Sequence, residues 1–167
     1  LGSEGFKEFA QKRVNLRKTL YFPNWADLTF ESHRPIERNY YPTKKVIISY
    51  TGNIGQAQDL ESLVEAVKLS KNRNYQIRLV GDGRAREFLK NLVLSEGLND
   101  QIKFYDSVHS KSLLGLFEES DFLYLSLNDS PLFSKTVPAK FQTYLASGVP
   151  IIGLISGETN HLIKDNN

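Results

Sequence analysis

The fold is decided by the stretch VIISY at residues 46–50, a short apolar run that ends at Gly52. β-Branched side chains dominate this run and a glycine terminates it, which is typical of a buried strand. Apolar side chains then recur at helical spacing over residues 60–67, and Asp59 and Glu61 stand where a helix dipole favours acidic groups. A strand followed directly by an amphipathic helix predicts the first unit of a parallel α/β fold.

The same alternation continues toward the C-terminus. Further strands are predicted at residues 76–80, 102–105, 122–127 and 150–155. Apolar stripes and end signals predict the helices between them. The first has the stripe Phe88, Leu89, Leu92 and Val93 and ends before Gly97, and the second has Leu113, Leu114 and Phe117 after an N-cap at Ser110. The third has Phe141, Tyr144 and Leu145, with Pro138 at its first position and Gly148 after its end, and a last helix begins at about Glu158. This order predicts a doubly wound α/β domain, in which helices cover both faces of a parallel sheet.

The first part of the chain is less regular. We expect residues 1–45 to form an N-terminal segment and linker that packs on the domain of residues 46–167. Within it, the sequence fits a short helix that carries Phe6, Phe9 and Val14, one more strand at residues 20–22, a hydrophobic anchor at Trp25 and a surface loop at residues 29–44. Because the chain begins at Leu1 rather than at Met, we expect it to be a piece of a longer protein.

Composition excludes several classes of function. The chain has 167 residues, enough for one ordinary core, and it contains no Cys, which excludes a disulfide scaffold, a Cys-ligated metal and a thiol nucleophile. With three His residues, at 33, 109 and 161, a His-based metal site is not expected. The net charge of +2 lacks the clustered basic excess of a nucleic-acid binder. No apolar run approaches the roughly 18 residues of a membrane span, so a soluble chain is predicted.

Two glycine loops follow predicted strands, where open parallel sheets bind their ligands. The first, Gly52 to Gln58, can bring backbone amides and a helix N-terminus to an anion, but it lacks both the Rossmann and the Walker pattern. Taken alone, it favours a tight strand-to-helix turn, and the loop GDG at residues 81–83 fits a turn or a ligand loop equally well.

Lys140 is the more informative residue. It falls in the first turn of the helix after Pro138, and Thr143 lies one turn further on the same face. A lysine there adds positive charge to the positive end of the helix dipole, which favours a bound anion over a solvated side chain. His109 and His161 are expected on the surface.

A set of motifs resembles the group 1 glycosyltransferases in order and spacing. These motifs are PNWAD at residues 23–27, YTGNIG at 50–55, LVGDG at 79–83, VPAK at 137–140 and YLASGVP at 144–150. The resemblance is to the C-terminal, donor-binding domain of these retaining enzymes of the GT-B fold, and among them to the branch that builds capsule, O-antigen and other envelope polysaccharides. It implies a Rossmann-like domain that binds a UDP- or GDP-sugar for transfer to a saccharide or lipid-linked acceptor held by a missing N-terminal domain.

The resemblance also implies roles for individual residues. Lys140 would stabilise the leaving diphosphate as the catalytic residue, without a protein-bound metal or other cofactor. The substrate-binding positions would be Gly52, Asn53, Gly55, Gln58, Gly81, Val108, Lys135, Thr136, Thr143 and Glu158. The full-length enzyme would be cytoplasmic, with peripheral association at the inner face of the membrane left open, and no nucleic acid is expected as a partner. The 167 residues alone would bind nucleotide weakly and catalyse nothing.

The chain departs from the family pattern at four positions. Asn53 and Gln58 stand where many members have Arg and Lys, and Lys135 and Thr143 replace the Glu-x7-Glu pair. Lys140 would then carry more of the diphosphate charge, helped by Lys135. Two alternatives remain open: a GT-B sugar-nucleotide 2-epimerase, which would need the missing carboxylates, and a non-catalytic α/β module that binds a nucleotide or a protein.

Overall fold

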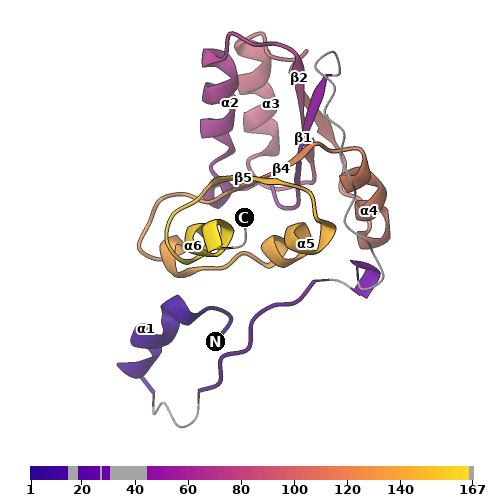
Figure 1. Ribbon diagram of the computed structural model, residues 1–167. Coiled ribbons are helices and arrows are strands. Elements are labelled where there is room, and N and C mark those ends of the chain that lie inside the picture. The colour runs from indigo at the N-terminus through magenta and orange to yellow at the C-terminus, as the bar shows by residue number, and fades with distance from the viewer. Residues whose placement is uncertain (15–18, 27, 31–44, 166–167) are drawn as a thin grey trace.

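The structure is a computed structural model that describes residues 1–14, 19–26, 28–30 and 45–165 (Figure 1). The predicted loop at residues 29–44 therefore lies mostly outside the described residues, as does His33; Leu28–Phe30 form a short 3-10 helix.

Five parallel strands form one sheet. They are β1 (Val46–Thr51), β2 (Tyr75–Val80), β3 (Ile102–Tyr105), β4 (Phe122–Ser126) and β5 (Ile151–Leu154). Their spatial order is β3-β2-β1-β4-β5, with Ile48 of β1 aligned with Ile77 on one side and with Phe122 on the other. This order confirms the predicted doubly wound fold, and every predicted strand from residue 46 onward is present within about one residue of its expected ends.

Helices connect successive strands. They are α2 (Leu60–Leu69), α3 (Arg86–Ser95), α4 (Ser110–Glu118), α5 (Ala139–Ser147) and α6 (Glu158–Asp165), with 3-10 turns at Gln56–Gln58 and Phe133–Lys135. Gly97 and Gly148 adopt left-handed φ angles of 65° and 69° just past α3 and α5, as the sequence predicted for helix ends. Pro138 is the N-cap of α5 rather than its first residue, and His109 rather than Ser110 takes the N-cap position of α4.

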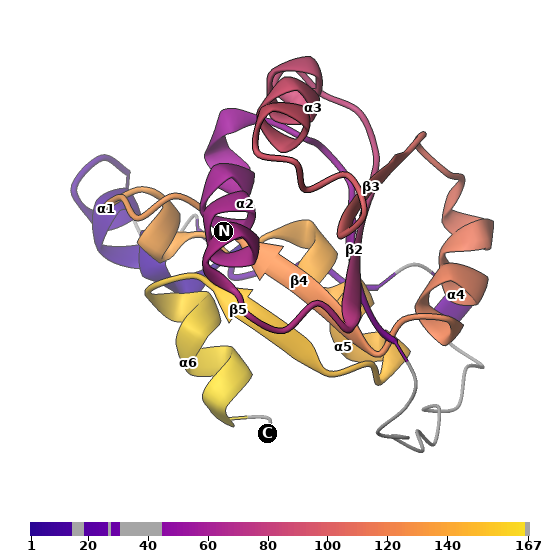
Figure 2. The same cartoon turned by 90° about the horizontal axis from the view of Figure 1, so that it is seen from above.

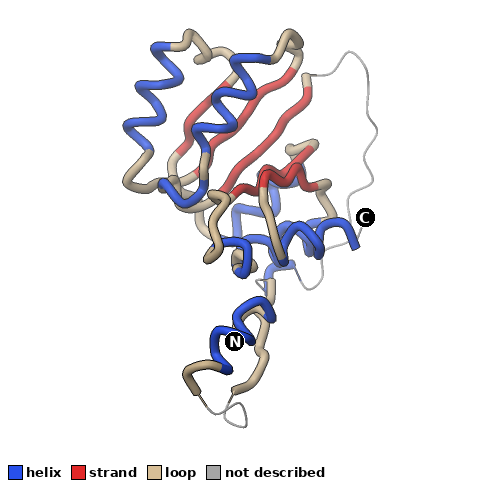
Figure 3. Tube along the Cα trace, turned by 90° about the vertical axis from the view of Figure 1, so that its left-hand side faces the viewer, coloured by secondary structure: helices blue, strands red, loops and turns tan. Residues whose placement is uncertain are grey.

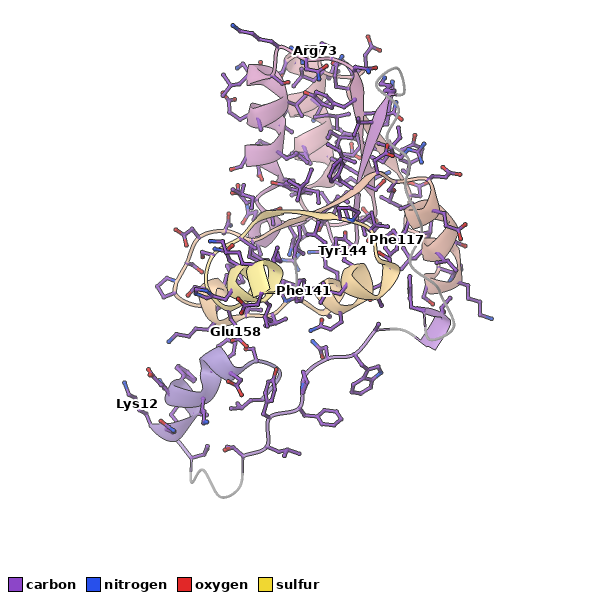
Figure 4. All side chains as sticks on the ribbon, viewed as in Figure 1. Lys12, Arg73, Phe117, Phe141, Tyr144 and Glu158 are labelled. Atoms are coloured by element: carbon purple, nitrogen blue, oxygen red, sulfur yellow. The ribbon has the colours of Figure 1, made fainter. Side chains whose placement is uncertain are left out.

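The helices cover the two faces of the sheet as two separate apolar layers (Figures 2 and 3). On one face α2 and α3 lie side by side and bury Leu60, Val64, Leu89 and Val93 against Tyr50, Ile77 and Leu79. On the other face, α4 and α5 bury Phe117, Phe141 and Tyr144 against Leu123 and Leu125, and Figure 4 shows the three aromatic side chains gathered around α5. Each such side chain contributes about 1.5–3 kcal/mol on burial, so the two layers hold the sheet rigid beneath the loops.

Two predicted apolar contacts are wrong. The side chains of Phe88 on α3 and Leu145 on α5 are 58% and 43% exposed. Each lies one position beside the stripe that meets the sheet, because a helix that packs on one face of a sheet buries only a narrow stripe.

The N-terminal segment, which we define as residues 1–14, lies beneath α6 and away from the sheet (Figure 1). Its helix, α1 (Lys7–Gln11), is shorter than predicted and leaves Phe9 and Val14 exposed. Residues 20–22 form no strand, and Trp25 is no buried anchor, since it is 69% exposed and contacts Phe22 edge-on with 5.4 Å between ring centroids. These residues bond instead to the start of the chain: the Phe22 amide donates to the Leu1 carbonyl at 2.8 Å, and the Leu1 ammonium donates to the Leu20 carbonyl at 2.5 Å.

The chain reverses direction between β1 and β4. After β1 it builds outward through β2 and β3, and then returns to place β4 and β5 on the other side of β1. The crevice beyond the carboxyl ends of β1 and β4 is therefore the point where loops diverge and a ligand can enter.

Candidate functional site

A cavity of about 400 Å³ lies at this edge of the sheet. It is lined by the ends of β1 and β2, the loop before α4, and the first turns of α5: Thr51, Gly52, Asn53, Val80, Gly81, Asp82, Ser107, Val108, Leu113, Lys140, Thr143 and Tyr144. Six of the residues expected at the site thus meet in one cavity: Gly52, Asn53, Gly81, Val108, Lys140 and Thr143.

Lys140 reaches this cavity because of how α5 begins. Pro138 takes an extended conformation as N-cap, with φ −63° and ψ 139°, and makes no side-chain cap. The apolar residues Phe141 and Tyr144 turn to the core, which leaves Lys140 and Thr143 on the cavity side, as the helical spacing predicted. Lys140 therefore lies in the first turn of α5, the turn whose N–H groups lack partners within the helix.

Burial lowers the pKa of Lys140 from its ordinary value of 10.5 to about 7. The cause is desolvation of the ammonium, and no described carboxylate forms an ion pair with it. Among the described residues that line the cavity, Lys140 is the one cation. The Asp82 carboxylate lines the same cavity but forms no ion pair with Lys140, so the amine is left open to a further negative charge.

Tyr50 is the hydrogen-bond partner of Lys140. The Lys140 Nζ donates to the Tyr50 Oη at 2.7 Å and lies 3.8 Å from the centroid of the Tyr50 ring. The Tyr50 hydroxyl in turn donates to the carbonyl of Asn53 in the first glycine loop. Burial, followed by the nearby Tyr144, raises the pKa of Tyr50, so its hydroxyl stays protonated and keeps this donor role.

The two glycine loops pack on each other as well as on the cavity. A Cβ at Gly81 would lie 1.9 Å from the carbonyl oxygen of Gly52, and Gly81 has a φ of +149°. The amides of Gly52 and Ile54 donate to the carbonyls of Val80 and Asp82 at 2.9 and 2.8 Å. The close contact between the two loop backbones therefore explains why a glycine stands at position 81. This agrees with the interpretation of the glycine loops as tight turns.

The Gly55 amide is also occupied. It donates to the Gln58 Oε1 at 3.1 Å, and the Asn53 Nδ2 donates to the same oxygen at 3.0 Å. Gln58 thus takes the position that an anion oxygen would need at this loop. Gly55 and Asn53 also line a second cavity of about 680 Å³ beside Arg84 and Phe88.

The structure does not bring five of the expected residues to the cavity of Lys140: Gly55, Gln58, Lys135, Thr136 and Glu158. Glu158 instead holds the N-terminal segment, since its carboxylate accepts the amides of Glu4 and Gly5 at 2.9 and 2.6 Å (Figure 4). The Lys135 carbonyl accepts from Ser3, and the Thr136 carbonyl accepts from Thr159 at 2.9 Å. These residues join α6 and the turn before α5 to the N-terminal segment.

Sequence reasoning missed Tyr50, Asp82 and the hydroxyl of Tyr144 as parts of this site. The Tyr144 hydroxyl accepts from the Thr51 amide at 3.0 Å, although the helical pattern assigned this side chain to the core alone. The available signal was Tyr50 at the end of the run VIISY, because the hydroxyl of a tyrosine must find a partner when its ring is buried.

The described residues offer neither a metal cluster nor a membrane-spanning helix. No group of three or more acidic, His or Cys side chains there could hold a metal ion. No helix in the described ranges has the length and apolar character to cross a membrane.

Comparisons with known proteins agree with this arrangement. A family model for "Glycosyl transferases group 1" matches residues 34–167. A putative colanic acid biosynthesis glycosyl transferase, WcaI of Escherichia coli (strain K12), is 27% identical over 145 residues, which are 83% of this chain and 35% of that protein. The chain therefore spans about a third of this curated relative.

Solved structures show the same fold. Sucrose-phosphate synthase from Thermosynechococcus elongatus superposes with a TM-score of 0.72 at 17% identity, over 96% of this chain and 41% of the other. The lipopolysaccharide outer core galactosyltransferase WaaB superposes with a TM-score of 0.70 at 15% identity, over 95% of this chain and 43% of the other. Anabaena HepE, in complex with UDP and glucose, superposes with a TM-score of 0.69 at 14% identity, over 96% of this chain and 45% of the other. The family model covers most of the chain, and the chain therefore belongs to the group 1 glycosyl transferases.

Proposed function

We propose that this chain is the donor-binding domain of a retaining glycosyltransferase that takes a UDP- or GDP-sugar. The observation that carries the proposal is Lys140: a desolvated lysine at the start of α5, in a cavity beyond the carboxyl ends of β1 and β2, with no ion-pair partner among the described residues. A diphosphate supplies such a partner. Val108 and Leu113 offer the apolar part of the cavity that a nucleobase needs.

In the proposed reaction, the bond between the anomeric carbon and the diphosphate oxygen breaks, and an acceptor hydroxyl takes the sugar with retention of configuration. Negative charge grows on the leaving diphosphate. Lys140 stabilises it through charge-assisted hydrogen bonds worth about 1.5–3 kcal/mol each, and the N–H groups of the first turn of α5 add to the same field.

Gly52, Asn53, Gly81 and Thr143 line the proposed donor site with Lys140. Because Gln58 occupies the Gly55 amide, this loop contributes fewer donors to the diphosphate than its glycines suggest. Residues 1–45 serve as segment and linker and residues 46–167 as the nucleotide-sugar domain of a longer enzyme. We further propose that the whole enzyme works in the cytoplasm on a saccharide or lipid-linked saccharide of the cell envelope; a distant relative in colanic acid biosynthesis supports this assignment.

Donor screening tests the proposal. UDP, GDP and their sugars are titrated into the full-length enzyme by calorimetry, and turnover is followed as release of UDP or GDP. We expect one base to bind clearly better, and Lys140→Ala to lower kcat by about 100-fold without lowering the melting temperature. Lys164→Ala, on the exposed end of α6, is the matched control. No binding at millimolar nucleotide would instead favour a non-catalytic module, and base-dependent binding without transfer would favour an epimerase.

A further inference from the structure

Lys140 meets its diphosphate only if its long side chain is held in the cavity. A lysine side chain has four rotatable bonds and loses conformational entropy when it is fixed. Gly52 lies beside the end of this side chain: a Cβ there would stand at ordinary van der Waals distance, 3.4 Å from the Lys140 Nζ and 3.6 Å from its Cε. Glycine has no side chain that could fix the amine, so another group must do so.

The Tyr50 hydroxyl has a fixed direction. Its proton goes to the Asn53 carbonyl, because a carbonyl oxygen can only accept. The hydroxyl must then accept from Lys140, as the 2.7 Å distance indicates. The lysine can donate this bond in either of its protonation states. As an ammonium, it keeps two further N–H groups for a ligand.

The Tyr50 ring is part of the core layer under α2 and α3, and the residue is fully buried. A phenylalanine would fill the same space. A buried hydroxyl is costly unless it is bonded, and the two partners of this one are the catalytic candidate and the loop that faces it. The hydroxyl therefore connects the lysine to the first glycine loop.

We propose that Tyr50 is the positioning residue of this site: its hydroxyl, fixed by the Asn53 carbonyl, holds the Lys140 side chain toward the donor diphosphate. This inference rests on the proposed function and adds to it a residue that contacts no substrate. The titratable groups that face Lys140 are Tyr50 of β1, Tyr144 of α5 and Asp82 of the loop after β2. Of these, Tyr50 alone is hydrogen-bonded to the amine within the described residues.

The test is Tyr50→Phe in the full-length enzyme, with Tyr124→Phe as the matched control. Tyr124 is another buried tyrosine of the sheet and lies outside the cavity. We expect Tyr50→Phe to lower kcat/KM for the donor by about 10- to 100-fold, because it removes one bond to a charged group. We also expect the alkaline limb of its pH–rate profile to move to lower pH, because loss of an acceptor disfavours the ammonium. Tyr124→Phe should change neither.

The outcomes separate the two proposals. If Tyr50→Phe matches Tyr124→Phe in kcat/KM and pH profile while Lys140→Ala is impaired, the positioning role is overturned and the donor site stands. If Lys140→Ala is also unimpaired, the site assignment itself fails. Should Tyr50→Phe fold poorly, 3-fluorotyrosine at position 50 keeps the shape and weakens the acceptor; a severalfold loss with the same acid shift supports the role, and an unchanged profile refutes it.

Discussion

Donor binding should take up a proton at Lys140. In the free protein, burial holds the pKa of this lysine near 7, so about half of the molecules carry a neutral amine at neutral pH. A diphosphate beside the amine favours the charged form and raises the pKa again. Affinity must therefore fall as pH rises through 7, because the protonated fraction of the free site falls.

The size of the effect follows from that value. If only the ammonium binds, the apparent Kd of a nucleotide-sugar rises about 25-fold between pH 6.5 and pH 8.5. The uptake is about half a proton at pH 7 and about nine-tenths of a proton at pH 8. Calorimetric titrations of the full-length enzyme in two buffers with different ionisation enthalpies measure this number directly. A nucleotide-sugar is the right probe, since its diphosphate diester does not titrate near neutral pH.

Two variants separate this linkage from other pH effects. Lys140→Arg keeps its charge at every relevant pH and should bind with no proton uptake. Lys140→Met should bind weakly and should stabilise the free protein, by at most about 5 kcal/mol at neutral pH. The sign follows because the folded pKa lies below the unfolded one, so the wild type gains stability as pH rises from 7 toward 10.5. Equal proton uptake by the wild type and Lys140→Arg would refute the reasoning.

Three further predictions concern the loops and the N-terminal segment. Gln58→Lys frees the Gly55 amide and places an ammonium on the first glycine loop, outside the cavity of Lys140; if the diphosphate extends to this loop, donor binding should tighten about fivefold in a calorimetric titration, and weaker binding would count against a phosphate there. Gly81→Ala should destabilise by about 3 kcal/mol or more in urea denaturation, because its Cβ meets the Gly52 carbonyl at 1.9 Å, whereas Gly115→Ala, in open space on α4, should stabilise by about 0.5–1 kcal/mol. Glu158→Ala should speed hydrogen exchange across the N-terminal segment without changing donor affinity, and protection equal to the wild type would contradict the role of that carboxylate.

Much of the fold could be predicted from local pattern. Each strand from residue 46 onward is a short apolar run between turn residues, and each helix after it carries an apolar stripe. Gly97 and Gly148 were correctly placed at helix ends because a left-handed φ is a local requirement. The prediction failed at residues 20–22 and at Trp25, where an apolar run without a packing partner gives no buried element.

The candidate site was predictable only in part. The helical spacing of Lys140 and Thr143 placed both on the side of α5 that faces the cavity. Pattern alone could not show that Gln58 fills the Gly55 amide, nor that Glu158 holds the N-terminal segment. Both are polar side chains that found a backbone partner nearby, and such choices depend on distances of a few ångströms.

Periodicity and end signals act within a few residues, so the order of elements, the parallel sheet and the lysine at the start of a helix follow from the chain alone. The contact between Tyr50 of β1 and Lys140 of α5, 90 positions away in the chain, arises only when the domain folds. The same packing desolvates that lysine and moves its pKa to about 7. Desolvation arises from all the neighbours together, and these neighbours come from strands and helices that are adjacent only after the sheet has formed.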